Sequence, residues 1–521
     1  MSPAAIAKLK AQSAWNVIVS NPKEYEQHLA DCDALLVRSA VKVKPEVLAK
    51  APKLRVIGRA GVGVDNVDLP AATAAGVLVM NTPGGNAVSV AEHTLALMLS
   101  LARGVPEASA STRSGKWEKK KFLGNELRGK TLGVVGLGNI GQEVVRRARG
   151  FEMRIIATDP YVSAQSALDL GMELVDLETL LREADYISLH VGLTPETRGM
   201  INAGSIAKMK DGVRIINCAR GELVEGAALA EALQSGKVAG AGLDVFDPEP
   251  LAAGDPLLSA PNLVATPHIA GSTEEAQEIV GLRIVDQLVE YLNNGVAINA
   301  VNMPAVSVEQ YKAISPFVTL AERLGSFAAH IASGNPRALR LTYSGRIAEQ
   351  STSLIRNAAL AGALNRWLSS RANLVNAMQL AAQRNLNITE SRDVRAAHVD
   401  SVQVELETEA GVFSVSGAVV LDRPRLLQVD GIACEAALSG RLLYLRNHDV
   451  PGVIGHVGTV LGNNKVNIAN FSLGRADRAD GDAPLRAVAV IEVDAPVPEE
   501  VLQQLLSNPA VRLARVVEPG T

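Results

Sequence analysis

The chain has 521 residues, of which 20% are charged and 3% are aromatic, and its formal net charge is −4. This length exceeds what one hydrophobic core supports and predicts about three or four domains with aliphatic interiors. The slightly acidic balance gives no general attraction to nucleic acid or membranes, so we expect neither as a partner. The three cysteines lack motif spacing, which indicates a reducing, cytoplasmic setting and argues against a disulfide framework or a metal site.

Residues 1–82 alternate helix-like and strand-like segments, which is typical of a small α/β unit with a parallel sheet. The candidate strands are 16–20, 34–38, 55–59 and 77–81. The almost wholly apolar segment 92–103 predicts a buried helix. A long amphipathic segment, 274–292, is expected to return to the first unit. We therefore predict a split domain formed by residues 1–82 and 268–302.

The central stretch T-L-G-V-V-G-L-G-N-I-G, residues 131–141, predicts a strand, a turn and a helix over 139–150. In such a motif Gly136 allows the tight turn, Gly138 lets a pyrophosphate approach the backbone, and Gly141 permits close packing of helix and strand. The stretch therefore predicts a dinucleotide site.

A second feature follows the next candidate strand, 154–158, which ends at Asp159, 18 residues beyond Gly141. A carboxylate at this place binds both ribose hydroxyls and repels a 2′-phosphate. The alternative is that Asp159 is a capping residue. Further strand candidates recur near Ile187, Ile215, Gly242 and Val264. Together with those near Val134 and Ile155 they predict a doubly wound, NAD-binding domain of six strands over residues 83–267.

Three polar residues, Arg220, Glu249 and His268, each follow a strand candidate. A doubly wound sheet places its ligands at the carboxyl ends of its strands. A guanidinium can hold a substrate carboxylate, and a histidine beside a carboxylate can take the proton from an alcohol. The alternatives are a surface ion pair for Arg220 and a structural role for His268.

The remaining chain has a different pattern. Residues 303–440 combine helix-like segments 316–333, 351–369 and 374–384 with two alternating runs, 402–408 and 412–421, which predicts an α+β domain. Residues 441–521 are predicted to form strand 442–446, helix 452–463, strand 467–473, strand 486–493, helix 499–506 and strand 511–517. This β-α-β-β-α-β order is ferredoxin-like.

Several motifs in order, G-L-G-N-I-G, Asp159, N-C-A-R-G, D-V-F-D-P-E-P and T-P-H-I-A-G-S, resemble the D-2-hydroxyacid dehydrogenase family. The strings V-R-S-A (37–40), G-R-A-G-V-G-V-D-N-V-D (58–68) and N-T-P-G-G-N (81–86) resemble its D-3-phosphoglycerate dehydrogenase branch. The resemblance covers residues 13–300. It implies a Rossmann domain, a split flavodoxin-like substrate domain, and NAD-dependent oxidation of 3-phosphoglycerate to 3-phosphohydroxypyruvate, the entry step of serine synthesis. The alternatives are a glyoxylate or hydroxypyruvate reductase and a non-catalytic, NAD-sensing protein that binds a partner.

The resemblance also implies site residues. The catalytic set is Arg220, Glu249 and His268. The cofactor set is Gly136, Gly138, Asn139, Ile140, Gly141, Asp159, Cys218, Ala219, Arg220, Asp244, His268 and Gly271. The substrate set is Arg38, Ser39, Arg59, Gly85, Asn86, Lys119, Arg220 and His268. Lys119 would reach the site of a neighbouring subunit, and the alternative is that its lysine run is a solvated face. The family usually begins with an apolar strand, so either the first sheet lacks a strand or the start lies upstream.

Residues 441–518 resemble an ACT domain, a module that binds amino acids, and residues 303–440, with N-L-V-N-A at 373–377, resemble the intervening domain of the long enzyme form. The ACT resemblance implies an L-serine effector at Asn447, Asp449 and Asn467. Asn447 stands where the family usually has histidine or tyrosine. The alternative is that both domains mainly hold an oligomer together. We expect a homo-oligomer, a dimer or a tetramer.

Overall fold

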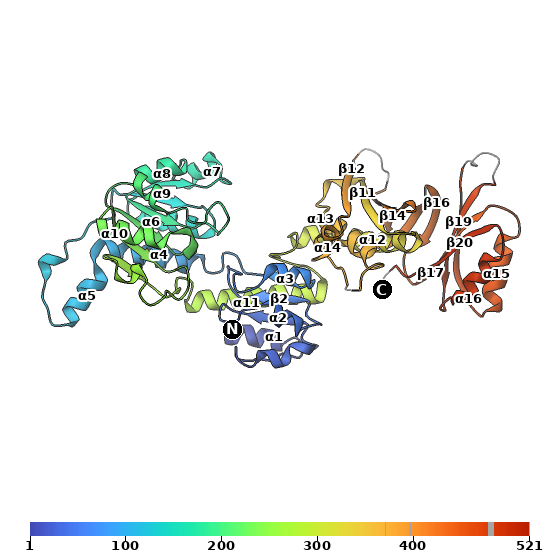
Figure 1. The fold of residues 1–521 in the computed structure, drawn as a ribbon, viewed down its shortest axis with the longest axis horizontal. Helices are drawn as coiled ribbons and strands as arrows, with labels where there is room; N and C mark the ends of the chain where they lie inside the picture. Colours follow the sequence, from blue (N-terminus) through green and yellow to red (C-terminus); the bar gives the residue numbers. More distant parts are fainter. Residues whose placement is uncertain (370, 395–398, 478–483, 520–521) are drawn as a thin grey trace. The chain divides into compact units, whose positions relative to one another are not determined.

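The computed structural model describes residues 1–521 except 370, 395–398, 478–483 and 520–521 (Figure 1). The chain divides into two compact units. Unit 1 consists of Met1–Val17, Ala60–Val62 and Thr82–Val285, and unit 2 consists of Ile18–Arg59, Gly63–Asn81 and Asp286–Thr521. The strands of the described residues form one sheet in unit 1 and three in unit 2.

Unit 1 is built on a parallel sheet with strand order β10-β9-β8-β7-β4-β5-β6. Its strands are β4 (Thr131–Val135), β5 (Arg154–Thr158), β6 (Glu173–Leu174), β7 (Tyr186–Leu189), β8 (Val213–Asn217), β9 (Val238–Leu243) and β10 (Leu263–Ala265). The chain adds β5 and β6 on one side of β4 and then crosses to β7, so the change of direction lies between β4 and β7. The doubly wound prediction is confirmed. The count of six strands was wrong, because β6 has only two residues and no apolar run.

The helices of unit 1 cover both faces of this sheet. One buried aliphatic layer lies under α4 (Ala87–Arg103) and α6 (Asn139–Gly150), and the other lies under α8 (Leu177–Glu183), α9 (Ala203–Lys208) and α10 (Gly226–Ser235). Helix α6 has the predicted bounds, whereas α4 begins five residues earlier than predicted, because its first turn also buries Ala87 and Val90. The remaining helical elements of unit 1 are α1 (Pro3–Lys10), α5 (Val105–Arg113), η2 (Lys119–Lys121), α7 (Ala164–Asp169), η3 (Gly221–Leu223) and η4 (Pro256–Ser259). Helix α11 (Glu274–Asn294) begins in unit 1 and ends in unit 2.

The first sheet of unit 2 is parallel and consists of β1 (Ala34–Val37), β2 (Val56–Arg59) and β3 (Leu78–Met80), with η1 (Tyr25–Asp31), α2 (Pro45–Ala49) and α3 (Leu69–Ala74). The expected return of the chain is visible at β3, because the Val301 N–H donates to the carbonyl of Val79 at 2.8 Å. The predicted strand at 16–20 was wrong. Ile18 and Val19 are more than half exposed, and none of the strands in the described residues pairs with this run.

The second sheet of unit 2 has the order β12-β11-β13-β14-β15-β16 and is antiparallel except for β11 with β12. Its elements are α12 (Val308–Ile331), β11 (Pro336–Ser344), η5 (Arg346–Glu349), α13 (Ser353–Leu364), α14 (Ala377–Gln383), β12 (Asn387–Asp393), β13 (Ser401–Thr408), β14 (Gly411–Val420), β15 (Arg423–Val429) and β16 (Ile432–Ala437). The α+β prediction is confirmed, but only β13 and β14 were anticipated. Helix α12 begins eight residues before the predicted start, because Ser307 and Gln310 form a capping box there and the helix continues through Pro316.

The third sheet of unit 2 has the order β18-β19-β17-β20, with α15 and α16 on one face (Figure 1). The elements are β17 (Arg441–His448), α15 (Val453–Asn463), β18 (Ile468–Arg475), β19 (Arg486–Val493), α16 (Glu499–Leu506) and β20 (Val511–Val517), so the predicted β-α-β-β-α-β order is confirmed. Across the described residues, no helix has the length and apolar character that crossing a membrane requires.

Candidate active site

The glycine turn follows β4. Gly136 has φ +94°, and a Cβ there would lie 2.8 Å from the carbonyl oxygen of His190. A Cβ on Gly141 would lie 2.1 Å from the carbonyl oxygen of Gly136, so both glycines are needed for the packing of the turn. At Gly138 the space around a Cβ is open, and no side chain caps the start of α6. This exposed helix N-terminus, with Asn139 and Ile140 in its first turn, fits the diphosphate of a dinucleotide.

Asp159 lies just after β5 and joins two loops. Its Oδ2 accepts a hydrogen bond from the Leu137 N–H at 2.7 Å, and its Oδ1 accepts one from the Tyr161 N–H at 2.8 Å. Asp159 caps no described helix, because the N-cap of α7 is Ser163; its carboxylate instead closes the turn at Tyr161 and fixes the glycine turn. Each carboxylate oxygen has a further lone pair, so these bonds leave room for ribose hydroxyls.

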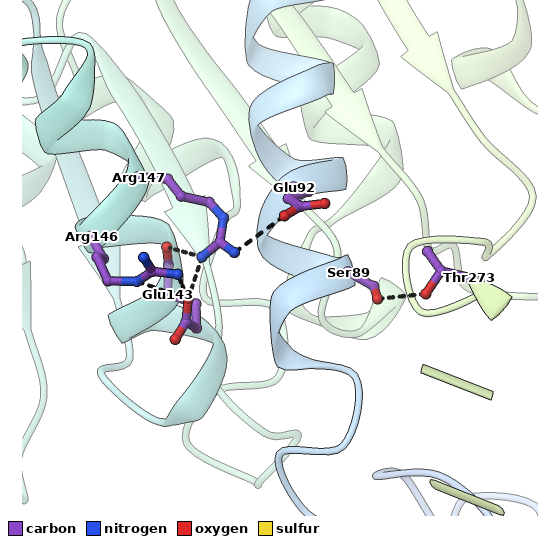
Figure 2. Close-up of polar contacts among 6 residues, drawn as sticks. All are labelled: Ser89, Glu92, Glu143, Arg146, Arg147 and Thr273. Carbon is purple, nitrogen blue, oxygen red and sulfur yellow. Dashed lines mark hydrogen bonds and ion pairs between the residues drawn. The ribbon is translucent and has the colours of Figure 1, made fainter. Parts of the chain in front are cut away.

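Helix α6 is held against α4 by charged side chains (Figure 2). The Arg147 guanidinium bonds to Glu143 one turn earlier and reaches Glu92 of α4 at 3.2 Å. The hydrogen bonds from Arg146 and Arg147 hold the pKa of Glu143 below its usual range. On α4, Oγ of Ser89 lies 2.8 Å from Oγ1 of Thr273, which directly precedes α11. Helix α4 thus supports both the dinucleotide helix and the start of α11.

The predicted catalytic residues His268 and Glu249 are in direct contact in unit 1. The Nδ1 of His268 lies 2.8 Å from Oε2 of Glu249, while Oε1 of Glu249 accepts the N–H of Phe246 at 2.9 Å. His268 has φ +53°, an uncommon backbone conformation for a residue with a side chain. The pair is solvent-accessible, with 56% of the His268 and 36% of the Glu249 side chain exposed. The arrangement leaves Nε2 of His268 to meet a substrate hydroxyl.

Arg220 is positioned by a buried asparagine at the end of β8. The Asn217 side chain is fully buried, accepts the N–H of Ala219 at 3.0 Å and donates to the carbonyl of Arg220 at 2.7 Å. A Cβ on Gly221 would lie 2.0 Å from the carbonyl carbon of Phe246, so the Arg220 turn packs against the loop that carries Glu249. Asn217 was not among the predicted site residues, although its place at a strand end was a usable signal.

Cys218 and Asp244 are the buried members of the predicted cofactor set. Burial raises the pKa of the Cys218 thiol to about 12, so it stays protonated. Asp244 is fully buried just after β9. Its carboxylate accepts from the N–H groups of Ile269 and Ala270, both at 2.8 Å.

Gly85 and Asn86 lie at the start of α4 and pack against the segment that follows His268. A Cβ on Gly85 would lie 2.6 Å from Cγ1 of Val280, and one on Gly271 would lie 2.7 Å from Nδ2 of Asn86. Among the described residues, Oδ1 of Asn86 is buried without a hydrogen-bond partner, as expected of a group that awaits a ligand. Unit 1 therefore brings Asn86 and Gly271 together.

Arg38, Ser39 and Arg59 lie in unit 2. Arg59 ends β2 opposite Val37, the last residue of β1, so Arg38 and Arg59 share one edge of the first sheet. Asn66 Nδ2 donates to the carbonyls of Arg38 and Val41, which fixes the loop after β1. Lys119, in η2 of unit 1, is exposed.

The structure brings the predicted effector residues only partly together. Asn447 and Asp449 line a cavity of about 360 Å³ whose walls are mostly aliphatic, whereas Asn467 is not part of that lining. Arg475 forms an ion pair with Asp449 at 2.9 Å, and Asn467 donates to Asp494 at 2.6 Å. Within the described residues, no cluster of three or more histidine, cysteine or acidic side chains could hold a metal ion.

Comparison with known proteins decides the family. Residues 95–270 match the NAD binding domain of D-isomer specific 2-hydroxyacid dehydrogenases, residues 313–430 the D-3-phosphoglycerate dehydrogenase intervening domain, and residues 441–510 the ACT domain. The chain is 42% identical to a D-3-phosphoglycerate dehydrogenase of Methanocaldococcus jannaschii over 95% of its own length and 94% of the relative's. The chain belongs to the D-3-phosphoglycerate dehydrogenase family.

Other relatives agree with this assignment. The Bacillus subtilis D-3-phosphoglycerate dehydrogenase is 36% identical over 96% of this chain and 95% of its own. Among solved structures, the TT0316 protein of Thermus thermophilus is 38% identical, with a TM-score of 0.52 over 57% of this chain and 96% of that one. A glyoxylate reductase from Paecilomyes thermophila is 32% identical, with a TM-score of 0.52 over 57% of this chain and 94% of that one. Residues 95–270 are thus an NAD-binding domain of this dehydrogenase family.

Proposed function

We propose that the chain catalyses the NAD-dependent oxidation of 3-phosphoglycerate to 3-phosphohydroxypyruvate, the first step of L-serine biosynthesis. The observation that carries the chemistry is the contact of 2.8 Å between His268 Nδ1 and Glu249 Oε2. The family membership, which extends over nearly the whole chain, supports the substrate.

We assign the transfer of the substrate's hydroxyl proton, and the stabilisation of the charges that this transfer creates, to three side chains. When bound, NAD accepts the hydride that leaves C2 of the substrate. As that C–H bond breaks, Nε2 of His268 takes the hydroxyl proton and the C2–O bond becomes a carbonyl. Glu249 stabilises the imidazolium that results, and Arg220 holds the substrate carboxylate and the carbonyl oxygen. Atoms balance as 3-phosphohydroxypyruvate, NADH and one proton.

The cofactor assignment concerns the glycine turn and Asp159. The diphosphate would be held by the turn of Gly136, Gly138 and Gly141 and by the amides at the start of α6. The ribose would be held by Asp159. The carboxylate of Asp159 supports NAD over NADP, because it repels a 2′-phosphate. Cys218, Ala219, Asp244 and Gly271 complete the proposed cofactor set.

The substrate's two anionic groups account for the arginines. We assign the phosphate to Arg38, Ser39 and Arg59, and the carboxylate side to Gly85, Asn86 and Arg220. Arg59→Ala should raise the KM for 3-phosphoglycerate at least about tenfold with a smaller change in kcat. Arg55→Ala is the matched control, because Arg55 precedes the same strand and stacks on Tyr291, with its guanidinium carbon 6.0 Å from the ring centroid. Equal KM values for the two variants would overturn the phosphate assignment.

Glyoxylate or hydroxypyruvate reduction is the second candidate, favoured by the structural likeness to a glyoxylate reductase. The intervening and ACT domains favour the first candidate. Comparing the reduction of 3-phosphohydroxypyruvate with that of hydroxypyruvate decides between them, because only the first substrate uses a phosphate site. A higher kcat/KM for plain hydroxypyruvate would overturn the proposal.

We infer that the chain forms a homo-oligomer through residues 105–123, which comprise α5 and the segment that follows it. Trp117 is 85% and Leu123 94% exposed in unit 1, which is costly for large apolar side chains in water. In that assembly Lys119 would contact the substrate of a neighbouring subunit. Light scattering on wild type and Trp117→Lys tests this inference, and an unchanged mass for the variant would contradict it.

We also propose L-serine as an effector at Asn447, Asp449 and Asn467. For serine to bind, either the ion pair between Arg475 and Asp449 opens, or Arg475 keeps this contact and also binds the serine carboxylate. Inhibition by serine that is lost in Asp449→Ala supports this proposal, whereas serine without effect on wild type overturns it.

Finally, we propose domain boundaries at 1–82 with 268–302, 83–267, 303–440 and 441–521.

A further inference from the structure

Asp244 anchors the segment that carries His268. Its carbonyl accepts the N–H of His268 at 2.9 Å, and its carboxylate accepts the N–H groups of Ile269 and Ala270, both at 2.8 Å. A third contact to the carboxylate is the hydroxyl of Thr266 at 2.6 Å. One buried residue therefore binds the backbone on both sides of the His268 side chain.

His93 of α4 extends this anchor. Its Nε2 lies 3.0 Å from Oγ1 of Thr266 and 3.5 Å from Oδ1 of Asp244. An ionised carboxylate only accepts hydrogen bonds, so the Thr266 hydroxyl donates to Asp244 and its oxygen accepts from His93. The order of donation, from His93 to Thr266 to Asp244, assigns the proton of the His93 ring to Nε2.

The charge of Asp244 is stabilised by these contacts. Burial alone would raise its pKa, but the hydrogen bonds from His93, Thr266 and the two backbone amides outweigh burial and hold the pKa below its usual value. A charged acceptor binds backbone N–H groups more strongly than a neutral one. His268 has φ +53°, an uncommon conformation that persists only when its surroundings hold it. Strong hydrogen bonds to the neighbouring amides of Ile269 and Ala270 therefore help to keep the His268 backbone in this conformation.

We propose that His93 is a positioning residue for His268, acting through Thr266 and Asp244 on the backbone of residues 268–270. The inference rests on the proposed function for its catalytic meaning. Without the His93 donor, Thr266 and Asp244 lose an ordered partner and the His268 ring is no longer fixed against Glu249. Small displacements of a catalytic group have large effects on rate.

The first experiment compares His93→Leu with His93→Gln, which retains an N–H donor. His93→Leu should lower kcat about 10- to 100-fold, and His93→Gln should recover most of the loss. Glu92→Gln is the control, because Glu92 lies on the same helix but faces Arg147 of α6 (Figure 2). Equal kcat values for His93→Leu and Glu92→Gln would overturn the proposal, as would a His93→Gln variant that recovers none of the lost turnover.

The second experiment needs no turnover. Hydrogen exchange at the amides of Ile269 and Ala270 should be at least about tenfold faster in His93→Leu and Thr266→Val than in Glu92→Gln or Thr266→Ser. Unchanged exchange would overturn the positioning role. A wild-type enzyme that does not oxidise 3-phosphoglycerate would refute the proposed function, whereas the exchange rates would still decide the role of His93.

Discussion

Glu249→Gln tests the acid–base pair by removing one charge and keeping the side-chain shape. In the structure two donors face the carboxylate, the N–H of Phe246 at 2.9 Å from Oε1 and Nδ1 of His268 at 2.8 Å from Oε2. An amide offers one acceptor oxygen, so in glutamine an NH₂ group must face one of these donors. Hydrogen bonds to charged groups contribute about 1.5–3 kcal/mol, which corresponds to a roughly 10- to 100-fold loss of kcat. Because both side chains are partly exposed, the lower end of this range is expected.

The assay is steady-state NADH formation from 3-phosphoglycerate, with NADH affinity measured separately by fluorescence titration. Turnover should fall while NADH affinity stays within about twofold, since Glu249 contacts His268, the proposed base, and belongs to no part of the proposed cofactor set. Glu249→Asp is the companion variant, because it keeps the charge but shortens the reach to His268. Turnover of Glu249→Gln within a factor of about two of wild type would refute the role assigned to Glu249.

Three further predictions address the turn, the fold and acid stability. Gly141→Ala should weaken NADH binding at least about tenfold, because its Cβ would lie 2.1 Å from the carbonyl oxygen of Gly136; an unchanged titration would contradict this. Gly76→Ala should lower the melting temperature more than Gly431→Ala. Both glycines have positive φ, at +71° and +77°, so an alanine at either position costs about 1–2 kcal/mol of backbone strain. Only the alanine at position 76 would also place its Cβ 2.6 Å from Nδ2 of Asn373. Equal shifts would contradict that packing. Burial lowers the pKa of His190 from 6.5 to about 4, so its stabilising effect is complete above pH 6.5 and is lost by about 1.4 kcal/mol per pH unit as the pH falls toward 4. Urea unfolding at pH 7 and pH 5 should therefore show a weaker pH dependence in His190→Asn than in wild type, and equal dependence would contradict the buried neutral histidine.

Elements with strong periodicity were predictable from the sequence. Helix α6 has the predicted bounds, and the ferredoxin-like order of the last domain was confirmed, because each element there carries its own apolar pattern between clear turns. The strand-end positions of Arg220, Glu249 and His268 also follow from the doubly wound pattern.

Features that depend on tertiary partners were not predictable. The run at 16–20 looks like a strand but has no neighbour to pair with, and β6 has no apolar run but completes the sheet through β5. Helix α12 continues through Pro316 although an interior proline removes one backbone hydrogen bond, because its apolar face is buried in the core of the domain. The contact of His93 with Thr266 joins residues 173 positions apart, and no local pattern indicates it.

The most direct test of the proposed reaction is NADH formation by the full chain with NAD and 3-phosphoglycerate, followed by the absorbance of the reduced nicotinamide. We predict turnover that requires the phosphorylated substrate and that falls by orders of magnitude in His268→Ala while NADH affinity is kept. Absence of 3-phosphoglycerate-dependent NADH formation in wild type, or near-normal turnover in His268→Ala, would contradict it.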